Sequence, residues 1–194
     1  GHDLDQMISV GATGCPPVEL ASGNADPVLR EGFVVASPQT ARGWGDAAAI
    51  AKFTGSLISS SELGIDKDRV YCTGVSMGGA GTWVAGTTKI FAAIAPVCGA
   101  GAVSPASLAS VSVWAFHGAN DIVVPVGVTD EMVEALKATR SSMVGEAEVK
   151  YTRYDAAPAP TGWEDYTGHA SWIPAYAGPG LWAWLLEHSL ASSD

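Results

Sequence analysis

The segment from Arg69 to Gly81 constrains the fold more than any other part of the chain. A β-rich run leads into Gly74-x-Ser76-x-Gly78, and a run of small, helix-compatible residues follows. This pattern between a strand and a helix is typical of a sharp turn that lifts a serine hydroxyl clear of a sheet. We expect glycine at both flanking positions because a Cβ atom there would collide with the neighbouring strand or helix. The pentapeptide alone also arises by chance in turns, but its context favours a nucleophile elbow.

A nucleophilic serine needs a base, and the base needs an orienting carboxylate. In proteins with such a turn, the usual order of these residues along the chain is Ser, then Asp or Glu, then His. Of the four histidines, His2 lies upstream of the serine, and His117 ends an apolar run, Val111 to Phe116, that predicts a buried strand. His188 falls within a predicted C-terminal helix. The predicted base is therefore His169, in the loop before that helix.

The predicted acid is Asp121, in the loop that follows the strand ending at Phe116. Parallel sheets place functional groups beyond the carboxyl ends of their strands. Ser76 would attack an acyl carbonyl, His169 would take and return the proton, and Asp121 would fix the imidazole tautomer. Taken singly, Asp121 is equally typical of a turn and His169 of a helix-capping loop. The Met77 backbone N–H, at a helix N-terminus, is the predicted oxyanion donor.

The remaining patterns predict an α/β fold, a mostly parallel sheet of about five strands with helices on both faces. Asp46 is a plausible N-cap. The helices are expected at Asp46–Ser60, Met77–Gly86, Thr129–Thr139 and from Pro179-Gly180 onward. The strands are expected at Arg69–Thr73, Ala92–Val97, Val111–Phe116 and, as a half-exposed edge strand, Glu148–Tyr154. A chain of 194 residues without a dividing linker predicts one domain, residues 1–194.

Two tryptophans are candidate substrate-binding residues. Trp163 lies in an aromatic, proline-containing loop, Ala156 to Gly168, directly before His169. That loop fits two interpretations equally well: a surface loop packed on its own aromatics, or a wall of the acyl or alcohol pocket. Trp44, and the side chain of Met77, are further candidates for the same pocket.

Composition excludes some partners and leaves others open. The net charge is −10 with no Lys/Arg cluster, which argues against nucleic-acid binding. No apolar run approaches the roughly 20 residues that cross a bilayer, so we expect no membrane span. The acidic balance suggests a soluble protein, either cytoplasmic or secreted with its leader removed. The oligomeric state is not indicated.

The three cysteines predict no metal site, and no motif predicts a cofactor. Cys72 and Cys98 lie in apolar strand segments and fit small buried hydrophobes. A disulfide from Cys15 is possible but has no support in the sequence. The wide spacing matches no metal-ligand pattern.

Three longer motifs resemble those of small serine esterases of the α/β-hydrolase superfamily. They occupy Gly74–Trp83, Trp114–Pro125 and Gly168–Tyr176, and the similarity runs from about Gly32 onward. The group includes predicted peptidases, phospholipase/carboxylesterases and feruloyl-esterase-like members. The resemblance implies an α/β-hydrolase fold, here truncated or minimal, and a carboxylic-ester hydrolase mechanism with Ser76, Asp121 and His169 at the catalytic positions. By the same matching, His117 is a supporting residue near the acid.

The chain departs from that family at its start. Such proteins usually carry two or three strands before the segment matching Gly32 to Gln39, and a His-Gly loop there supplies a second oxyanion donor. One absent strand would lie between the strand at Phe33–Ala36 and the strand leading to Ser76. A processed product, a separate second fragment, or a minimal sheet that pairs these two strands directly would each account for this. Losing one of two oxyanion donors typically costs about 10²- to 10³-fold in turnover.

These observations together predict a serine carboxylesterase that hydrolyses small or short-chain acyl esters through an acyl-enzyme intermediate. No long insertion separates Val97 from Val111, which argues against a lidded lipase. Feruloyl esters, thioesters or amides are alternative substrates for the same chemistry. A non-catalytic binding module on an α/β-hydrolase scaffold is an alternative of a different class.

Overall fold

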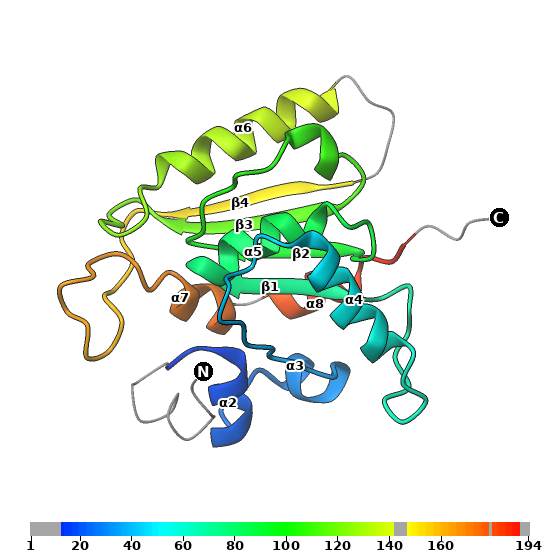
Figure 1. Cartoon of the computed structure of the whole chain (residues 1–194). Helices are drawn as coiled ribbons and strands as arrows, with labels where there is room; N and C mark the ends of the chain where they lie inside the picture. Colours follow the sequence, from blue (N-terminus) through cyan, green and yellow to red (C-terminus); the bar gives the residue numbers. More distant parts are fainter. Residues whose placement is uncertain (1–12, 142–146, 179, 191–194) are drawn as a thin grey trace.

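The computed structural model describes residues 13–141, 147–178 and 180–190 (Figure 1). His2 and the predicted helix start at Pro179 lie outside the described residues. In chain order the elements are α2 (Pro16–Ser22), α3 (Pro27–Gly32), α4 (Ala47–Ile58), β1 (Tyr71–Val75), α5 (Met77–Gly86), β2 (Ala93–Val97), the 3₁₀-helix η1 (Pro105–Leu108), β3 (Ser112–Gly118), α6 (Gly127–Ser141), β4 (Val149–Tyr154), α7 (Trp172–Ala177) and α8 (Leu181–Leu186).

The four strands form one parallel sheet in the order β1-β2-β3-β4. Parallel neighbours need a crossover on one face of the sheet, and α5 and α6 supply two of these crossovers. All four strands therefore end at the same edge, which lies on the left in Figure 1. The predicted α/β class with a parallel sheet flanked by helices is confirmed, as is the edge position of β4.

The predicted strand at Phe33–Ala36 is wrong. Residues 33–40 have no strand or helix structure, and the side chains of Val34 and Val35 are 58% and 39% exposed. A strand needs a hydrogen-bonded neighbour, and within the described ranges β1 pairs with β2 alone. The sheet there has four strands rather than about five, so direct pairing of this segment with the serine strand does not occur.

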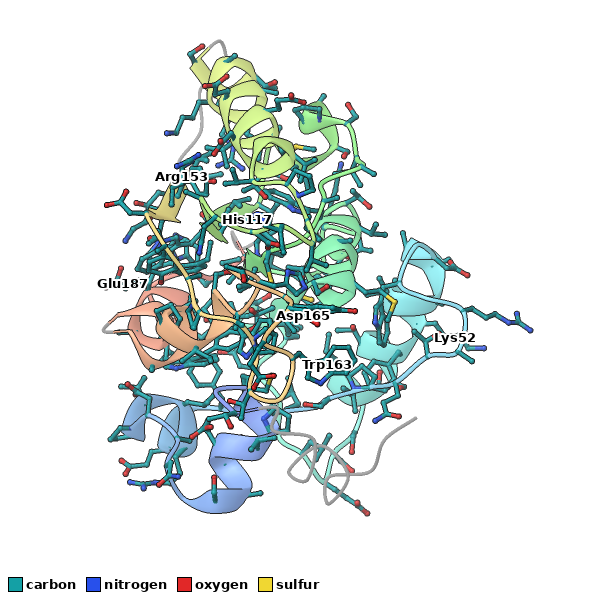
Figure 2. The ribbon with its side chains drawn as sticks, turned by 90° about the vertical axis from the view of Figure 1, so that its left-hand side faces the viewer. Lys52, His117, Arg153, Trp163, Asp165 and Glu187 are labelled. Atoms are coloured by element: carbon teal, nitrogen blue, oxygen red, sulfur yellow. The ribbon has the colours of Figure 1, made fainter. Side chains whose placement is uncertain are left out.

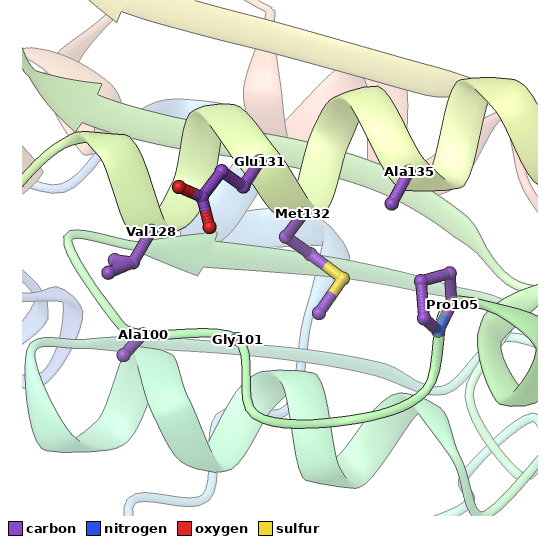
Figure 3. Close-up of a pocket in the computed structure, with 7 residues that line it drawn as sticks. All are labelled: Ala100, Gly101, Pro105, Val128, Glu131, Met132 and Ala135. Atoms are coloured by element: carbon purple, nitrogen blue, oxygen red, sulfur yellow. The ribbon is translucent and has the colours of Figure 1, made fainter.

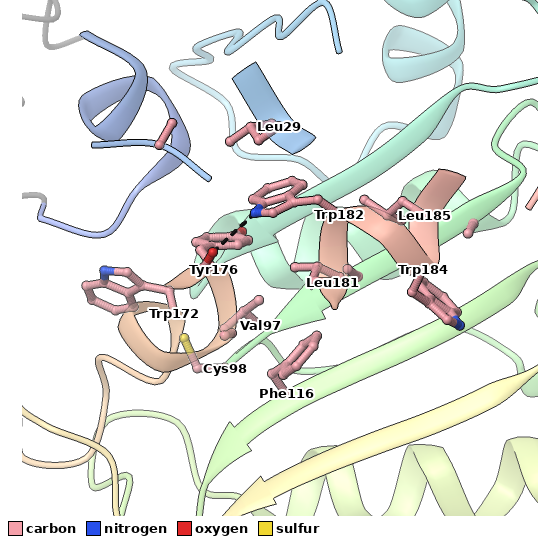
Figure 4. Packing of buried hydrophobic residues seen from close by; sticks show 14 of the residues in the cluster. Leu29, Val97, Cys98, Phe116, Trp172, Tyr176, Leu181, Trp182, Trp184 and Leu185 are labelled. Carbon is pink, nitrogen blue, oxygen red and sulfur yellow. Dashed lines mark hydrogen bonds between the residues drawn. The ribbon is translucent and has the colours of Figure 1, made fainter. Parts of the chain in front are cut away.

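Both faces of the sheet are covered by helices. On one face, Ala93, Ala95 and Val97 of β2 pack beneath α7 and α8, whose tryptophans fill the layer (Figure 4). On the other face, Ile94 packs against α5 and α6. Because successive strand residues point to opposite faces, burial of both faces explains why this strand reads as an unbroken apolar run.

Helix α5 approaches the sheet closely because of its glycines. A Cβ atom at Gly79 would lie 2.3 Å from the Val97 carbonyl oxygen. A Cβ atom at Gly99, in the loop after β2, would lie 2.3 Å from the Ala80 nitrogen. Such distances leave no room for any side chain, so glycine sets the separation between this helix and β2.

The helix ends confirm one expectation and correct another. Asp46 caps α4, where its Oδ1 accepts the Ala49 N–H at 3.0 Å. His188, by contrast, lies beyond α8, which ends at Leu186. Its Nδ1 lies 2.8 Å from the Trp184 carbonyl oxygen, an orphan acceptor at the helix end. In the part of the chain that the structure describes, no helix combines the length and apolar character needed to cross a membrane.

Candidate active site

Ser76 occupies a strained turn between β1 and α5. Its backbone angles are φ 54° and ψ −116°, a conformation that L-residues rarely adopt. A Cβ atom at Gly74 would lie 2.5 Å from the Gly78 carbonyl oxygen, so glycine is required there as predicted. The same expectation for Gly78 is wrong, since a Cβ atom at that position would meet nothing within 4 Å. Strain of this kind costs about 1–3 kcal/mol and clusters at functional sites.

The structure brings the three predicted side chains into one hydrogen-bonded chain. His169 Nε2 lies 2.8 Å from Ser76 Oγ, and His169 Nδ1 lies 2.8 Å from Asp121 Oδ2. His169 and Asp121 are both buried. Because the carboxylate only accepts, Nδ1 carries the ring proton and Nε2 accepts from the serine hydroxyl. This is the tautomer that a general base needs.

Asp121 is held as an anion by four hydrogen bonds. Its Oδ1 accepts the backbone N–H groups of Val123 at 2.8 Å and Val124 at 2.9 Å. Its Oδ2 also lies 3.2 Å from His117 Nε2. Burial alone would raise the Asp121 pKa, but hydrogen bonds from His117, His169 and these two amides hold the pKa well below its usual range. The group is therefore charged at neutral pH.

His117 supports the acid and does not contact the serine. It is fully buried at the end of β3, with Nε2 2.9 Å from the Val124 carbonyl oxygen and Nδ1 2.8 Å from Thr129 Oγ1. A carbonyl and a carboxylate can only accept, so the Nε2 proton is shared between the Val124 carbonyl and Asp121 Oδ2, and Nδ1 accepts from the threonine hydroxyl. The bond from His117 Nε2 to the Val124 carbonyl ties β3 to the loop that follows Asp121. His117 therefore lies in the supporting position that the resemblance implies.

Sequence reasoning missed Asn120, which connects the acid loop to the base loop. Its Nδ2 donates to the Ala157 carbonyl at 3.1 Å, and its Oδ1 accepts the Ala157 N–H at 2.8 Å. Nearby, Gly168 has φ +80°, and a Cβ atom there would lie 2.3 Å from the Asn120 carbonyl oxygen. The glycine directly before His169 was the one sequence clue to this close approach.

Met77 is the first residue of α5, and its side chain is 60% exposed. The N–H of a first helical residue has no intrahelical acceptor. It lies one residue after Ser76, which is where the predicted oxyanion donor should be. Its assignment to that role remains a prediction.

The two predicted pocket tryptophans lie in different places. Trp163 is 51% exposed on the loop before His169, and its ring centroid is 5.0 Å from that of Tyr166 (Figure 2). Trp44 is half-buried against α5, and a Cβ atom at Gly81 would lie 2.3 Å from the Trp44 Cβ. Gly81 is a full helical turn beyond Ser76. Substrate binding by either residue remains a prediction.

Cys98 lies close to Asp121 and His169. Ligand-type atoms of Cys98, Asp121 and His169 all lie within 4.8 Å of one another. Burial raises the pKa of the Cys98 thiol to about 12, so it stays protonated, whereas metals bind the thiolate. The nitrogen and oxygen of the other two residues are already hydrogen-bonded to each other. All three cysteines are free, so no disulfide forms at Cys15.

A separate groove of about 270 Å³ lies between α6 and the loop after β2 (Figure 3). Gly101 and Met132 form part of its wall, and Glu131 is its one titratable lining residue. None of Ser76, Asp121 and His169 lines it. The groove is therefore distinct from the site around the serine.

No protein-family model matches the chain, and no curated protein matches it. Among solved structures, it is similar to a thermostable esterase at 33% identity and a TM-score of 0.63, over 76% of this chain and 41% of the esterase. It is also similar to a Klebsiella pneumoniae protein assigned as a dienelactone hydrolase, at 21% identity and a TM-score of 0.55, over 74% of this chain and 62% of that one. An acylaminoacyl peptidase matches at 16% identity and a TM-score of 0.53, over 75% of this chain and 27% of the peptidase.

The chain thus spans less than half the length of the thermostable esterase. The other two similarities, at 21% and 16% identity, concern the fold alone. All three structures share with this chain the arrangement of a parallel sheet between helical layers.

Proposed function

We propose that this chain, which belongs by its fold to the α/β-hydrolase superfamily, is a serine carboxylesterase acting on small or short-chain acyl esters. The observation that carries the proposal is the unbroken hydrogen-bonded chain from Ser76 through His169 to Asp121. The esterase among the similar structures, at 33% identity, supports ester rather than amide cleavage. The proposal assigns residues 1–194 to a single hydrolase domain.

The first half of the reaction forms the acyl-enzyme. Ser76 Oγ attacks the ester carbonyl carbon while its proton passes to His169 Nε2. The carbonyl oxygen becomes an oxyanion, which the Met77 N–H stabilises at the start of α5. His169 then returns the proton to the leaving alcohol as the carbon–oxygen bond breaks.

The second half regenerates the serine. His169 takes a proton from water, whose oxygen attacks the acyl carbon, and then protonates Ser76 Oγ as the acid is released. In both halves His169 carries a positive charge transiently. The Asp121 carboxylate, 2.8 Å from Nδ1, stabilises that charge.

The test compares the wild-type chain with Ser76→Ala. A fluorophosphonate probe should label only the wild type, and turnover of p-nitrophenyl acetate and butyrate should depend on Ser76. Octanoate should be hydrolysed more slowly than acetate and butyrate if the acyl site is small. A wild-type protein that neither reacts with the probe nor turns over these esters would instead favour a non-catalytic binding module on the same scaffold.

A further inference from the structure

Several exposed apolar side chains lie close in the chain to the proposed catalytic residues. Of ten large hydrophobic residues that are exposed among the described residues, five adjoin the site in sequence. Met77 follows Ser76, two residues follow the acid, and two precede the base. These last four are Ile122, Val123, Trp163 and Tyr166. Exposed apolar groups that adjoin one another in space mark binding surfaces, and Trp163 and Tyr166 are in ring contact.

Two of these side chains form what we call the aromatic ledge, consisting of Trp163 and Tyr166. The Tyr166 ring lies edge-on to the His169 ring with centroids 6.4 Å apart, and Trp163 continues the series at 5.0 Å from Tyr166. The other aromatic neighbour of His169 is Trp172, which is buried. The ledge is therefore the aromatic neighbour of the base that a substrate can reach.

The ledge is held in place by the backbone. Trp163 N–H donates to the Pro160 carbonyl at 2.9 Å, Tyr166 N–H donates to the Trp163 carbonyl at 2.9 Å, and His169 N–H donates to the Tyr166 carbonyl at 3.1 Å. These three successive turns fix the backbone of both ring residues relative to that of His169. A surface ordered before binding loses less conformational entropy when a ligand arrives.

The chemistry of the reaction indicates which part of the ester lies on the ledge. His169 Nε2 must come within hydrogen-bond reach of the leaving alcohol oxygen to protonate it. The organic group of the alcohol, which is bonded to that oxygen, therefore extends past the exposed side chains next to His169, which include the ledge. We propose that the ledge binds the alcohol moiety and that the preferred substrates are esters of alcohols bearing an aromatic ring. The inference rests on the proposed esterase function and specifies its substrate class.

The negative charge near the ledge narrows the class of alcohol further. Glu164 and Asp165 lie between the two ring residues in the chain, and both are exposed. The chain also carries a net charge of −10. An alcohol moiety with a carboxylate on its ring would be repelled, so the ring is neutral or cationic.

The test keeps the acyl group constant and varies the alcohol. Benzyl and methyl acetate have leaving alcohols of similar acidity, so a difference in kcat/KM between them reports binding of the ring. We expect the wild type to prefer benzyl acetate, and Trp163→Ala to lower kcat/KM for benzyl acetate about 3- to 10-fold while changing that for methyl acetate less than about 2-fold. Phe53→Ala, which removes an exposed aromatic ring from α4, is the matched control and should change neither value.

An equal loss for both esters in Trp163→Ala, or an unchanged preference, would overturn the proposal. Faster turnover of 4-carboxybenzyl acetate than of benzyl acetate would overturn its charge component. Binding of benzyl alcohol, followed by saturation-transfer NMR, gives a readout that needs no turnover. Ser76→Ala should retain that binding and Trp163→Ala should lose most of it. Absence of Ser76-dependent turnover with binding intact would reject the esterase function alone, whereas binding unaffected by Trp163→Ala would reject the ledge.

Discussion

Asn120 and Ala157 exchange two hydrogen bonds, one from the Asn120 Nδ2 to the Ala157 carbonyl and one from the Ala157 N–H to the Asn120 Oδ1. The pairing needs a donor and an acceptor on one planar group, which a carboxamide provides. It joins the loop that carries Asp121 to the segment that leads to His169. The separation between Asp121 and His169 thus depends on a residue whose side-chain hydrogen bonds both go to Ala157.

Replacing Asn120 by Asp is expected to lower kcat/KM for p-nitrophenyl acetate roughly 10-fold, because the lost donor leaves two oxygen acceptors facing each other at a cost of about 1–3 kcal/mol. The KM should change little. Asn24→Asp is the matched control, since Asn24 is exposed. Equal kinetics for Asn120→Asp and Asn24→Asp would contradict a role for this pair of bonds.

Ser76→Gly should be more stable than Ser76→Ala. Both variants lack the hydroxyl, but glycine adopts φ 54° and ψ −116° without a Cβ clash. We expect a difference of about 0.5–2 kcal/mol in the free energy of unfolding, with release of strain partly offset by the greater freedom of unfolded glycine. Urea denaturation measures it. Equal stability of the two variants would mean that the strain released by glycine does not exceed the entropy that glycine adds to the unfolded chain.

Two adjacent glycines in α5 should respond in opposite ways to alanine. Gly78→Ala meets open space and gains helix propensity, so it should stabilise the fold by up to about 1 kcal/mol. Gly79→Ala forces a methyl group to within 2.3 Å of the Val97 carbonyl oxygen, and should destabilise the fold by about 1–3 kcal/mol. Thermal unfolding of both variants gives the comparison. A stable Gly79→Ala would show that the helix can move away from β2.

Asp121 should make the fold sensitive to acid. Its pKa is lower in the folded protein than the value of about 3.9 in an unfolded chain. Its stabilising contribution is therefore complete above pH of about 4, and is lost progressively as the pH falls below that value towards the folded pKa. Urea unfolding between pH of about 3 and 6 should show a steeper loss of stability for the wild type than for Asp121→Asn. Parallel curves for the two proteins would contradict this assignment.

The sequence correctly predicted those helices and strands that depend mainly on their own residues. Strand β2 is apolar on both faces, and its own residues therefore indicate a buried strand. Helix α5 follows the Gly-x-Ser-x-Gly turn, so the bounds of this helix, Met77–Gly86, were predicted correctly. The segment Phe33–Ala36 has β-forming residues, but no strand in the described part of the chain pairs with it. Whether a strand has a partner depends on the assembled sheet, and the local sequence pattern does not predict it.

The same distinction applies to the site. The order of Ser76, Asp121 and His169 along parallel strands was enough to predict that they lie close together, because those strands end at one edge. The contact between Asn120 and Ala157 was not predictable, since it spans 37 residues and depends on how two irregular loops meet. The open space around Gly78 was likewise not predictable, because the sequence does not show which side of a helix lacks a packed neighbour.

Strand β1, which delivers Ser76, is a border strand of the sheet across the described ranges, and its residues are only partly buried. Strand β2 beside it is wholly buried. Amide protons of border strands exchange with deuterium sooner than those of interior strands because opening them disrupts fewer contacts. On mild heating Ser76 would therefore lose its alignment while β2 and β3 still held together, and loss of the proposed Ser76-dependent turnover would precede the loss of circular dichroism.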